Sequence, residues 1–465
     1  MKINIASNEV IHFIGIGGIG MSGLAQIMCN MGFNIQGSDL NKNKNTDRLI
    51  EKGVKVYFEH HPKNLKKTTM VVISSAIKNT NEELIAAKNK KLPIFKRGEM
   101  LANIVSLKKN IVITGSHGKT TTTSLVANIL VEAGLDPTVI NGGVINSLKN
   151  NAQLGKGEWA VIESDESDGS FLKLPITYSI VTNLDKEHLD FYGSFENLKK
   201  SFCTFIDKTP SFGKSLVCAD DKNLKTLLKR CKSKNFLTYG FANNSNYQIT
   251  NLKKNKNFST FDLKLRLPSN KKIKINGIIV NLIGNHNVKN ATAAIAIAIN
   301  IGIKVSKIKK ALKKFLGIQR RFTKVFSDGK REFYDDYAHH PTEIRAVIKA
   351  AREVYKKRKI ICVFQPHRYS RVNSLINEFA LSFKLSNQVL LCPVYSAGEK
   401  IKNNFNQNYF SRLISKKSKI QVINIKDKNE LSNYFKKNLL ADEMVICMGA
   451  GSISNWIREI GNDLK

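Results

Sequence analysis

The segment from Thr114 to Thr123 reads Thr-Gly-Ser-His-Gly-Lys-Thr-Thr-Thr-Thr and directly follows the apolar run Ile111-Val112-Ile113. This order predicts a short buried strand, a glycine turn and a helix over about 120–132. Such a turn curls the backbone so that successive N–H groups point at an anion, and a lysine at the helix start adds positive charge. The segment therefore predicts an α/β fold that carries a phosphate-binding loop.

Each residue type in this loop has a chemical reason. Gly115 and Gly118 permit the tight turn, Lys119 supplies a mobile positive charge, and the hydroxyl of Thr120 suits Mg²⁺. The loop differs from the usual phosphate loop, because only two residues separate the first glycine from the Gly-Lys pair. The candidate nucleotide-binding residues are Gly115, Ser116, His117, Gly118, Lys119, Thr120 and Thr121.

A second glycine turn lies near the start of the chain. Gly15, Gly17 and Gly20 follow the apolar run at 10–14 in a G-x-G-x-x-G pattern, and Asp39 ends the next predicted strand. Taken alone, this pattern favours a dinucleotide such as NAD, with the acid on a ribose hydroxyl, and hence a dehydrogenase. The same turn holds any nucleotide diphosphate, so both interpretations remain open at this point.

With 465 residues, the chain is too long for one compact core. Alternating strand and helix patterns predict three α/β domains, at 1–107, 108–318 and 319–465. The first and third are expected to be Rossmann-like, and the central one is expected to hold the phosphate loop in a mixed sheet. There, the alternating stretch 241–282 suits an antiparallel addition at a sheet edge. We also expect a linker at 108–110, and a cap at 284–287 for a helix that starts near Val288.

Acidic and histidine residues follow two predicted strands of the central domain. Glu163 to Asp168 contains four carboxylates in six residues, and His188 follows the next strand. The carboxyl ends of parallel strands meet at one sheet edge, where a carboxylate commonly holds Mg²⁺ beside a phosphate loop. A solvated acidic loop and a structural histidine are the alternatives.

Two polar clusters follow strands of the third domain, at 335–341 and 365–371. Arg368 and Arg371 are spaced to clamp a carboxylate or phosphate, and His367 and Tyr369 beside them favour a binding site over ordinary surface basic residues.

The chain carries a net charge of +37, which raises the question of nucleic-acid or membrane-surface binding. The lysines form short scattered runs without aromatic interleaving, so compositional drift is favoured and no nucleic-acid partner is expected. The seven cysteines are far apart and form no CxxC pair, which predicts reduced thiols in a cytoplasmic protein. The first residues lack a signal-peptide core, and the most apolar helical stretch, 291–303, is too short to span a membrane.

Nine motifs in order resemble the Mur ligase family over essentially the whole chain, and the short GxxGK loop is the form that this family uses. The motifs are GIGGIGMSGLA, GSHGKTTT, ESDESDGSF, TNLDKEHLDFY, GNHNVKNATAA, RRF, DDYAHHPTE, QPHRYSR and VYSAGE. Within the family they look closest to the member that adds L-alanine to UDP-N-acetylmuramate. The resemblance implies ATP and Mg²⁺ as cofactors, an acyl-phosphate intermediate, and a monomer or weak homodimer. A recycling ligase that attaches a tripeptide to the same sugar is the nearest alternative.

The resemblance also implies roles for single residues. Thr120 and Glu163 would hold one Mg²⁺ and His188 a second. The catalytic set implied is Lys119, Glu163, His188, Asn287, Asn290, Arg321 and Asp336. The set implied for the UDP substrate is Gly15, Gly17, Gly18, Gly20, Asp39 and Ser74, and for the amino acid it is His340, His367, Arg368 and Arg371. Several sister ligases carry a carbamylated lysine where this chain has Cys203, so that modification is not expected.

Overall fold

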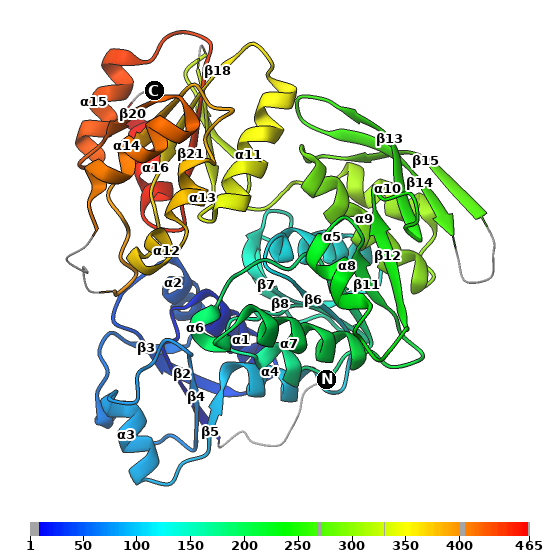
Figure 1. Cartoon of the computed structure of the whole chain (residues 1–465). Helices are drawn as coiled ribbons and strands as arrows, with labels where there is room; N and C mark the ends of the chain where they lie inside the picture. The colour runs from blue at the N-terminus through cyan, green and yellow to red at the C-terminus, as the bar shows by residue number, and fades with distance from the viewer. Residues whose placement is uncertain (1–8, 267–271, 330, 400–404, 464–465) are drawn as a thin grey trace. The chain divides into compact units, whose positions relative to one another are not determined.

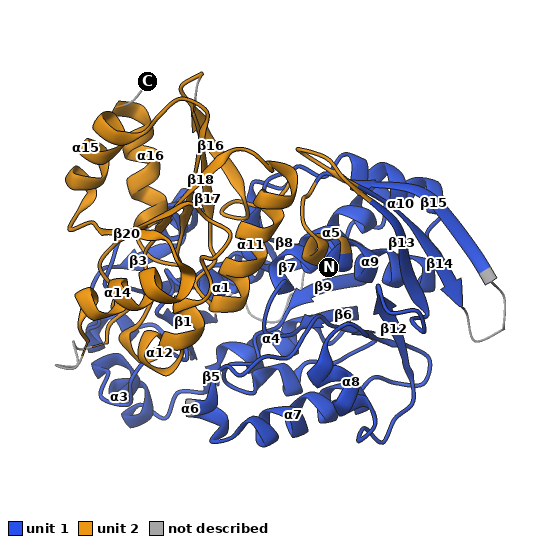
Figure 2. Ribbon diagram, turned by 45° about the horizontal axis from the view of Figure 1, so that its top comes forward, with its two compact units in different colours: residues 1–252, 260–281, 289–316 blue, residues 253–259, 282–288, 317–465 orange. Residues whose placement is uncertain are grey.

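The computed structural model describes residues 9–266, 272–329, 331–399 and 405–463. Three β-sheets with flanking helices confirm the predicted α/β class (Figure 1). The chain forms two compact units (Figure 2). The first unit holds residues 1–252, 260–281 and 289–316, with the first two sheets, and the second holds residues 253–259, 282–288 and 317–465, with the third sheet.

The first sheet is parallel throughout, in the order β3-β2-β1-β4-β5. Its strands are β1 (Val10–Ile14), β2 (Asn34–Ser38), β3 (Lys55–Tyr57), β4 (Met70–Ile73) and β5 (Ile94–Lys96). Its helices are α1 (Ile19–Asn30), α2 (Lys44–Glu51), η1 (Pro62–Leu65), α3 (Glu82–Asn89) and α4 (Arg97–Val105). Strand order reverses at β1, so the glycine turn after it opens at the switch point where ligands bind in such sheets.

The second sheet has ten strands in the order β15-β14-β13-β12-β11-β10-β6-β9-β7-β8. They are β6 (Lys109–Thr114), β7 (Thr138–Ile145), β8 (Asn150–Gln153), β9 (Trp159–Glu163), β10 (Tyr178–Val181), β11 (Ser215–Cys218), β12 (Phe236–Gly240), β13 (Tyr247–Lys254), β14 (Ser259–Arg266) and β15 (Lys272–Val280). The helices are α5 (Lys119–Glu132), η2 (Ser170–Lys173), α6 (Leu189–Tyr192), α7 (Phe195–Asp207), α8 (Lys222–Leu228), α9 (Asn285–Asn300) and α10 (Val305–Lys313). Strand β6 pairs in parallel with β9 and β10, so the phosphate loop opens between their carboxyl ends.

Two local expectations for this sheet were wrong, and a third was correct in part. The linker expected at 108–110 belongs to the fold, because β6 begins at Lys109 and the Lys108 ammonium donates to two backbone carbonyls, at Gly155 and Gly157. The helix expected near Val288 begins at Asn285, because the Gly284 carbonyl already accepts the first helical N–H groups. Strands β13 to β15 form the sheet edge, as expected. However, β13 pairs with β12 in parallel and not in antiparallel fashion, because the chain crosses back through 241–246 before β13 begins.

The third sheet has the order β16-β17-β21-β18-β19-β20, with β16 antiparallel and the other pairings parallel. Its strands are β16 (Thr323–Ser327), β17 (Glu332–Asp336), β18 (Lys359–Phe364), β19 (Gln388–Leu391), β20 (Gln421–Asn424) and β21 (Glu443–Met448). The helices are α11 (Pro341–Val354), α12 (Tyr369–Ser374), α13 (Ile376–Ala380), α14 (Gln407–Ser418), α15 (Lys428–Asn438) and α16 (Ile453–Asp463). Alternate residues of β18 enter two separate apolar cores, so both sheet faces are covered.

The helix α1 of the first sheet packs against β7 and β8 of the second sheet, within one compact unit. A side chain at Gly23 would meet Asn151 at 2.9 Å, and one at Gly98 would meet Ser170 at 2.5 Å. The Asn151 amide donates to the carbonyl of Ile19 at 2.9 Å. Glycine at these two contacts lets the backbones approach closely, which fixes the first glycine turn relative to the central sheet.

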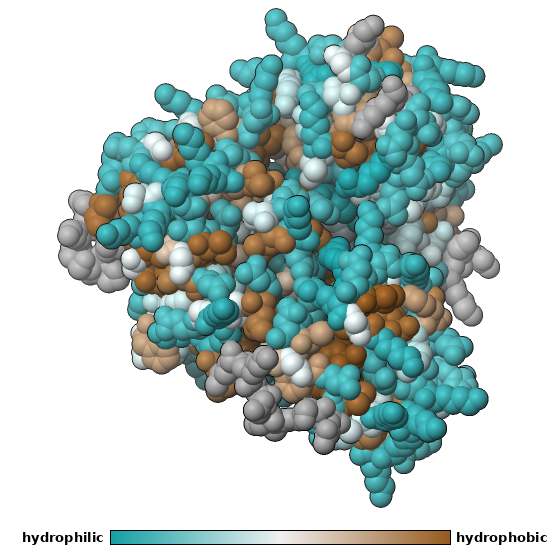
Figure 3. All heavy atoms as spheres, turned by 180° about the vertical axis from the view of Figure 1, so that it is seen from behind, coloured by the Kyte–Doolittle hydropathy of each residue, from teal (hydrophilic) through white to brown (hydrophobic). Residues whose placement is uncertain are grey.

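Across the described residues, none of the helices combines the length and apolarity needed to cross a bilayer. The expectation about a leader rested on the first residues, and 1–8 lie outside the described part of the chain. Exposed lysine pairs at 66–67 and 253–254 belong to different units. On the face drawn in Figure 3, hydrophilic residues prevail, with hydrophobic areas between them.

Candidate active site

The phosphate loop has a backbone that only glycine fits at two positions. Gly115 has a φ of 128° and Gly118 a φ of 81°, both in the left-handed region. A Cβ on Gly115 would lie 2.2 Å from the Thr182 hydroxyl, and one on Gly118 would lie 2.8 Å from the Asn290 side chain. The loop therefore curls against its neighbours, with its N–H groups at the start of α5, as an anion site requires.

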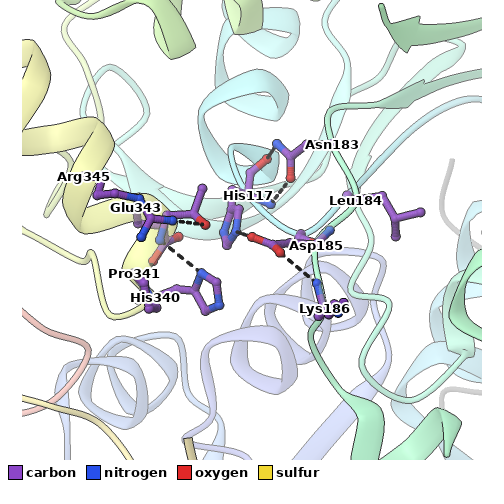
Figure 4. Close-up of polar contacts among 12 residues, drawn as sticks. His117, Asn183, Leu184, Asp185, Lys186, His340, Pro341, Glu343 and Arg345 are labelled. Carbon is purple, nitrogen blue, oxygen red and sulfur yellow. Dashed lines mark hydrogen bonds and ion pairs between the residues drawn. The ribbon is translucent and has the colours of Figure 1, made fainter. Parts of the chain in front are cut away.

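The end of β10 holds the loop in place. The His117 N–H donates to Asn183 Oδ1 at 2.8 Å, and the Asn183 amide donates back to the His117 carbonyl at 2.8 Å. The His117 ring lies 3.3 Å from Asp185 Oδ2 (Figure 4), and the Asp185 N–H donates to the Ser116 hydroxyl at 2.8 Å. These reciprocal bonds hold the loop against the end of β10.

Lys119 is nearly buried and bonds within the site. Its ammonium donates to the Gly115 carbonyl at 2.7 Å, to the Ser116 carbonyl at 3.3 Å and to Glu166 Oε2 at 2.8 Å. Burial acts to lower the pKa of Lys119, but the charges of Glu166 and Asp165 outweigh it and raise the pKa. The lysine is therefore a permanent cation at the loop.

The carboxylates after β9 form two groups. Glu163 faces the loop, accepting from the Thr120 hydroxyl at 3.1 Å and from the Gly142 N–H at 2.6 Å. His188 lies with the second group, in which one donor atom each of Asp165, Glu166 and His188 lies within 4.8 Å of the others. The predicted pair of Thr120 and Glu163 is thus brought together, and His188 faces Glu166 instead.

No pattern in the sequence singled out Glu166 within its acidic stretch. Its side chain is 1% exposed, and burial raises the pKa of its carboxyl despite the charge of Lys119. Burial also acts on the more exposed Asp165, but there the charges of Lys119 and His188 prevail and lower the pKa. Contact with Lys119, which only the tertiary structure reveals, distinguishes Glu166.

The two asparagines of α9 lie one turn apart. Asn290 is buried and lies against Gly118 of the phosphate loop. Asn287, which belongs to the second compact unit, donates from Nδ2 to the Ile283 carbonyl at 2.9 Å. Of the two predicted residues, the structure places Asn290 at the loop.

The first glycine turn gathers its predicted residues around β1. The N–H groups of Gly15 and Ile16 donate to the Ser38 carbonyl at 2.8 and 2.9 Å. The Gly17 N–H donates to Asp39 Oδ2 at 2.8 Å, and a Cβ on Gly15 would lie 3.2 Å from Ser74. Asp39 therefore fixes the turn itself.

A basic residue that sequence patterns did not single out lies at this turn. Arg97 begins α4, and a Cβ on Gly20 would lie 3.3 Å from its guanidinium. Gly18 of the same turn has no such close neighbour, because the nearest atom to a Cβ on it is 3.6 Å away. The guanidinium supplies the positive charge that this turn lacks in its own sequence, and its place after β5 at the same sheet edge is the signal that could have found it.

A buried carboxylate bonds to Ser38, the residue whose carbonyl accepts from this turn. Glu83 of α3 is fully buried, accepts from the Ser38 hydroxyl at 2.5 Å and from the Asn64 amide at 2.8 Å, and lies 3.3 Å from His12 and 2.9 Å from His60. Burial acts to raise the pKa of Glu83, but bonds and charge from His12 and the bonds from Ser38 and Asn64 lower it to about 2.

In the second unit, Asp336 ends β17 and is buried. Its carboxylate accepts from the N–H groups of Phe322 at 2.7 Å and Ala338 at 2.8 Å. Burial raises the pKa of Asp336 to about 6, against the charge of Arg321. The Arg321 guanidinium lies over Tyr337 and within 4.0 Å of Glu343, which caps α11 together with buried His340 (Figure 4).

The predicted residues at 367–371 gather around the end of β18 and the start of α12. The His367 ring stacks on Tyr395, and its Nδ1 lies 3.5 Å from the Arg371 guanidinium. Burial, followed by the charges of His339, Arg371 and Arg368, lowers the pKa of His367 to about 3. The ring is neutral near pH 7, beside two permanent cations of which Arg368 is exposed.

Three family models match successive parts of the chain. They are the Mur ligase family catalytic domain over residues 10–109, the Mur ligase middle domain over 113–298, and the Mur ligase glutamate ligase domain over 320–451. These matches agree with the three-sheet α/β fold, the phosphate loop and the cluster of possible metal ligands beside it. The chain belongs to the Mur ligase family.

Two curated proteins with similar sequences are named for the same activity. The UDP-N-acetylmuramate–L-alanine ligase of Pelagibacter ubique is 56% identical over 99% of both chains. That of Brucella anthropi is 42% identical, covering 100% of this chain and 98% of its own.

Solved structures agree on the fold. The UDP-N-acetylmuramate-alanine ligase of Thermotoga maritima has a TM-score of 0.83 at 27% identity, covering 97% of this chain and 98% of its own. A murein peptide ligase from Psychrobacter arcticus has a TM-score of 0.72 at 22% identity, covering 98% of both chains.

Proposed function

We propose that this protein joins L-alanine to the carboxylate of UDP-N-acetylmuramate, using ATP, in the synthesis of the peptidoglycan precursor. The observation that carries the proposal is a preformed phosphate loop, with Lys119 bonded inside it and Glu163 on Thr120, in a chain 56% identical over its length to a protein named for this ligation.

The phosphate loop would bind the β- and γ-phosphates of ATP. A carboxylate is a poor acyl donor because oxide is a poor leaving group, and transfer of the γ-phosphoryl group to it gives an acyl phosphate. Lys119 now bonds to two loop carbonyls and Glu166, and on binding it would turn toward the transferred phosphoryl group, whose charge it offsets. Asn290, beside Gly118, would line the same pocket.

The donor set fits Mg²⁺, because the ion favours carboxylate and hydroxyl oxygens next to phosphates. Thr120 and Glu163 would hold one ion, as predicted, and His188 a second. Glu166 Oε1 supports the second site, because it is buried without a hydrogen-bond partner in the described residues and lies 3.9 Å from His188 Nε2. When bound, the ions would neutralise charge that develops on the transferred phosphoryl group.

The first glycine turn would bind the diphosphate of the UDP substrate. Gly15, Gly17, Gly18 and Gly20 provide the close backbone approach, and Arg97 the charge. The second unit would bind L-alanine through His340, His367, Arg368 and Arg371. The arginines would hold its carboxylate, so that the neutral amine attacks the acyl phosphate and phosphate leaves. Arg321 and Asp336 stay predictions as residues that face the nucleotide phosphates.

Four further expectations belong to the proposal. The domain boundaries at 107/108 and 318/319, a cytoplasmic location and a monomer or weak homodimer remain predictions. So does the absence of a nucleic-acid partner, which a salt-sensitive shift of DNA by the protein would contradict.

The test is substrate-dependent release of ADP and phosphate by the pure protein with Mg²⁺. We expect release only when UDP-N-acetylmuramate and L-alanine are both present. A tripeptide offered in place of L-alanine separates the recycling ligase from the proposed one, and faster release with the tripeptide would reverse the assignment. No release with L-alanine or with the tripeptide would contradict the ligase proposal. Binding of NADH would instead support the alternative interpretation of the first glycine turn, a dehydrogenase.

A further inference from the structure

Two cysteines of the first unit face one another. Cys203 lies in α7 and Cys231 follows α8, and these two helices lie side by side (Figure 1). Their Sγ atoms are 2.6 Å apart. Bonded sulfurs lie about 2.05 Å apart, whereas heavy atoms in van der Waals contact without a hydrogen bond lie about 3.5 to 4.0 Å apart. The fold thus brings the two thiols nearly to bonding distance.

Backbone hydrogen bonds on both sides of Cys231 hold the pair in place, and those on one side go to Asp207. Asp207 lies one turn after Cys203 in α7, and its carboxylate accepts from the N–H groups of Ser233 at 2.9 Å and Lys232 at 3.3 Å. On the other side, the N–H of Cys231 bonds to the Leu227 carbonyl at the end of α8. The segment that carries Cys231 is therefore tied to the helix that carries Cys203.

The two thiols differ in access. Cys203 is partly exposed, whereas Cys231 is 3% exposed. Burial, the Cys203 sulfur and the charge of Asp207 raise the pKa of Cys231. An incoming disulfide would therefore react first with Cys203, and Cys231 would resolve the mixed disulfide from behind.

We propose that Cys203 and Cys231 form a reversible disulfide by exchange with a small-molecule disulfide, such as oxidised glutathione. The Cys203 thiolate attacks the reagent and releases one thiol, and the Cys231 thiolate then attacks Cys203 Sγ and releases the second. The protein loses two electrons and two protons, and the reagent is reduced to two thiols. In a reducing cytoplasm the two cysteines stay as thiols, so the disulfide forms only when the small-molecule thiols around the protein become oxidised.

A shared metal ion is the rival occupant, since donor atoms of both cysteines and Asp207 lie within 4.8 Å of one another. Two thiolates on one tetrahedral Zn²⁺, each about 2.3 Å from the metal, lie about 3.8 Å apart. The separation of 2.6 Å is too short for that arrangement and favours the disulfide.

The bond would close a loop between helices that contact the active-site segments. Tyr192, just before α7, bonds through its hydroxyl to the Glu166 carbonyl, and Asn223 of α8 donates to the Leu184 carbonyl at 2.7 Å. The two cysteines are 28 residues apart. Closing a loop of this length is expected to raise the midpoint of thermal unfolding of this unit by roughly 5 to 10 °C.

The experiment titrates the full chain with mixtures of oxidised and reduced glutathione. We expect two of the seven thiols to disappear together, a mass loss of about 2 Da, a cross-linked peptide joining Cys203 to Cys231, and the higher unfolding midpoint, all reversed by dithiothreitol. A cross-link to another cysteine, or a stable glutathione adduct without a second lost thiol, would overturn the proposal. So would a zinc ion bound at one per chain with both thiols protected.

Single variants separate the two roles. Cys203→Ser should abolish the cross-link, and Cys231→Ser should trap a glutathione adduct on Cys203. Cys29→Ser is the matched control, because Cys29 is the other partly exposed cysteine, and it should leave the cross-link intact. Each protein is checked for wild-type circular dichroism in the reduced state. A cross-link in Cys203→Ser, or no adduct in a folded Cys231→Ser, would contradict the assigned order.

Discussion

The two glycine turns of the first unit follow the same plan and differ in charge. Each begins at the end of a central parallel strand, β1 or β6, and opens a helix, α1 or α5. The first turn uses its Gly17 N–H to hold Asp39 and has Arg97 above Gly20. The second carries its own cation, Lys119, paired with Glu166. Both turns have the backbone form of an anion site, and under the proposed function the charge around each would decide whether phosphate is only held or also transferred.

The carboxylates beside the two turns, Glu83 and Glu166, differ in the direction of their pKa shifts. Hydrogen bonds stabilise the charged form of Glu83 beneath the first turn and lower its pKa, whereas burial raises the pKa of Glu166 beside the second. The first carboxylate is a structural charge with all its partners in place. The second has one buried oxygen without a hydrogen-bond partner in the described residues, which agrees with its proposed place at the second Mg²⁺ site.

The largest effect is expected from Lys119→Ala. We expect ADP release to fall roughly 10²- to 10³-fold, because the variant lacks the cation that offsets transferred charge, while UDP-N-acetylmuramate binding stays intact. The release assay measures the loss of turnover, and titration calorimetry measures the binding of UDP-N-acetylmuramate. The variant also leaves Glu166 buried without its ion-pair partner, which is costly for stability.

A double variant separates stability from chemistry. Lys119→Ala with Glu166→Gln removes the unpaired charge, so the midpoint of thermal unfolding should recover toward that of the wild type while ADP release stays low. Recovery of release in the double variant would show that Lys119 acts on the fold alone, and the contrast between the two turns would fail.

Gly115→Ala and Gly18→Ala compare the turns as backbone structures. At Gly115 an added Cβ meets Thr182 at 2.2 Å with φ in the left-handed region, so we expect the free energy of unfolding to fall by roughly 3 to 4 kcal/mol. At Gly18 the nearest atom is 3.6 Å away, so the change should be below about 0.5 kcal/mol. Urea unfolding followed by circular dichroism measures both, and equal losses would contradict the geometry.

The last of these effects depends on pH. The pKa of Glu83 is about 2 in the fold and 4.5 ordinarily, so its stabilisation is complete above pH 4.5 and is lost as pH falls toward 2. Its size above pH 4.5 is about 3 kcal/mol. Glu83→Gln should therefore weaken hydrogen-exchange protection of β1 at pH 7, with the difference from wild type shrinking in acid.

The exposed neighbour Glu82 is the matched control for this measurement. Glu82→Gln should leave protection of β1 unchanged at either pH. If Glu83→Gln showed the same loss of protection at pH 3 as at pH 7, the charge of Glu83 would have no part in holding the first turn.

Both turns were predictable because their signals are local. An apolar run, glycines at fixed spacing and a following helical stretch lie within about 20 residues of one another, and backbone sterics need no distant partner. The pairing of Thr120 with Glu163 was also predictable, since strand ends of a parallel sheet meet at one edge. The errors at 108–110 and 285–287 concern the limits of elements. Bonds from Lys108 to the distant Gly155 and Gly157 carbonyls draw the expected linker into the fold, and the neighbouring Gly284 carbonyl starts the helix earlier than expected.

Glu166 and Arg97 could not be singled out by the same means. Glu166 is one of four carboxylates in a short acidic stretch, and only its contact with Lys119, 47 residues earlier, distinguishes it. Arg97 lies in a lysine-rich chain, and its role depends on the approach of α4 to Gly20. The pairing of Cys203 with Cys231 likewise depends on how α7 and α8 pack, since their spacing matches no motif.

By itself, the sequence determined the α/β class, the positions of both glycine turns and the chemistry of the phosphate loop, because these follow from short-range sterics and periodicity. The tertiary structure alone decided which carboxylate pairs with Lys119, which guanidinium covers the first turn, and which thiols meet. Those contacts join residues far apart in the chain, and their energies depend on burial, which raises or lowers a pKa and strengthens a charge only after the core has excluded water.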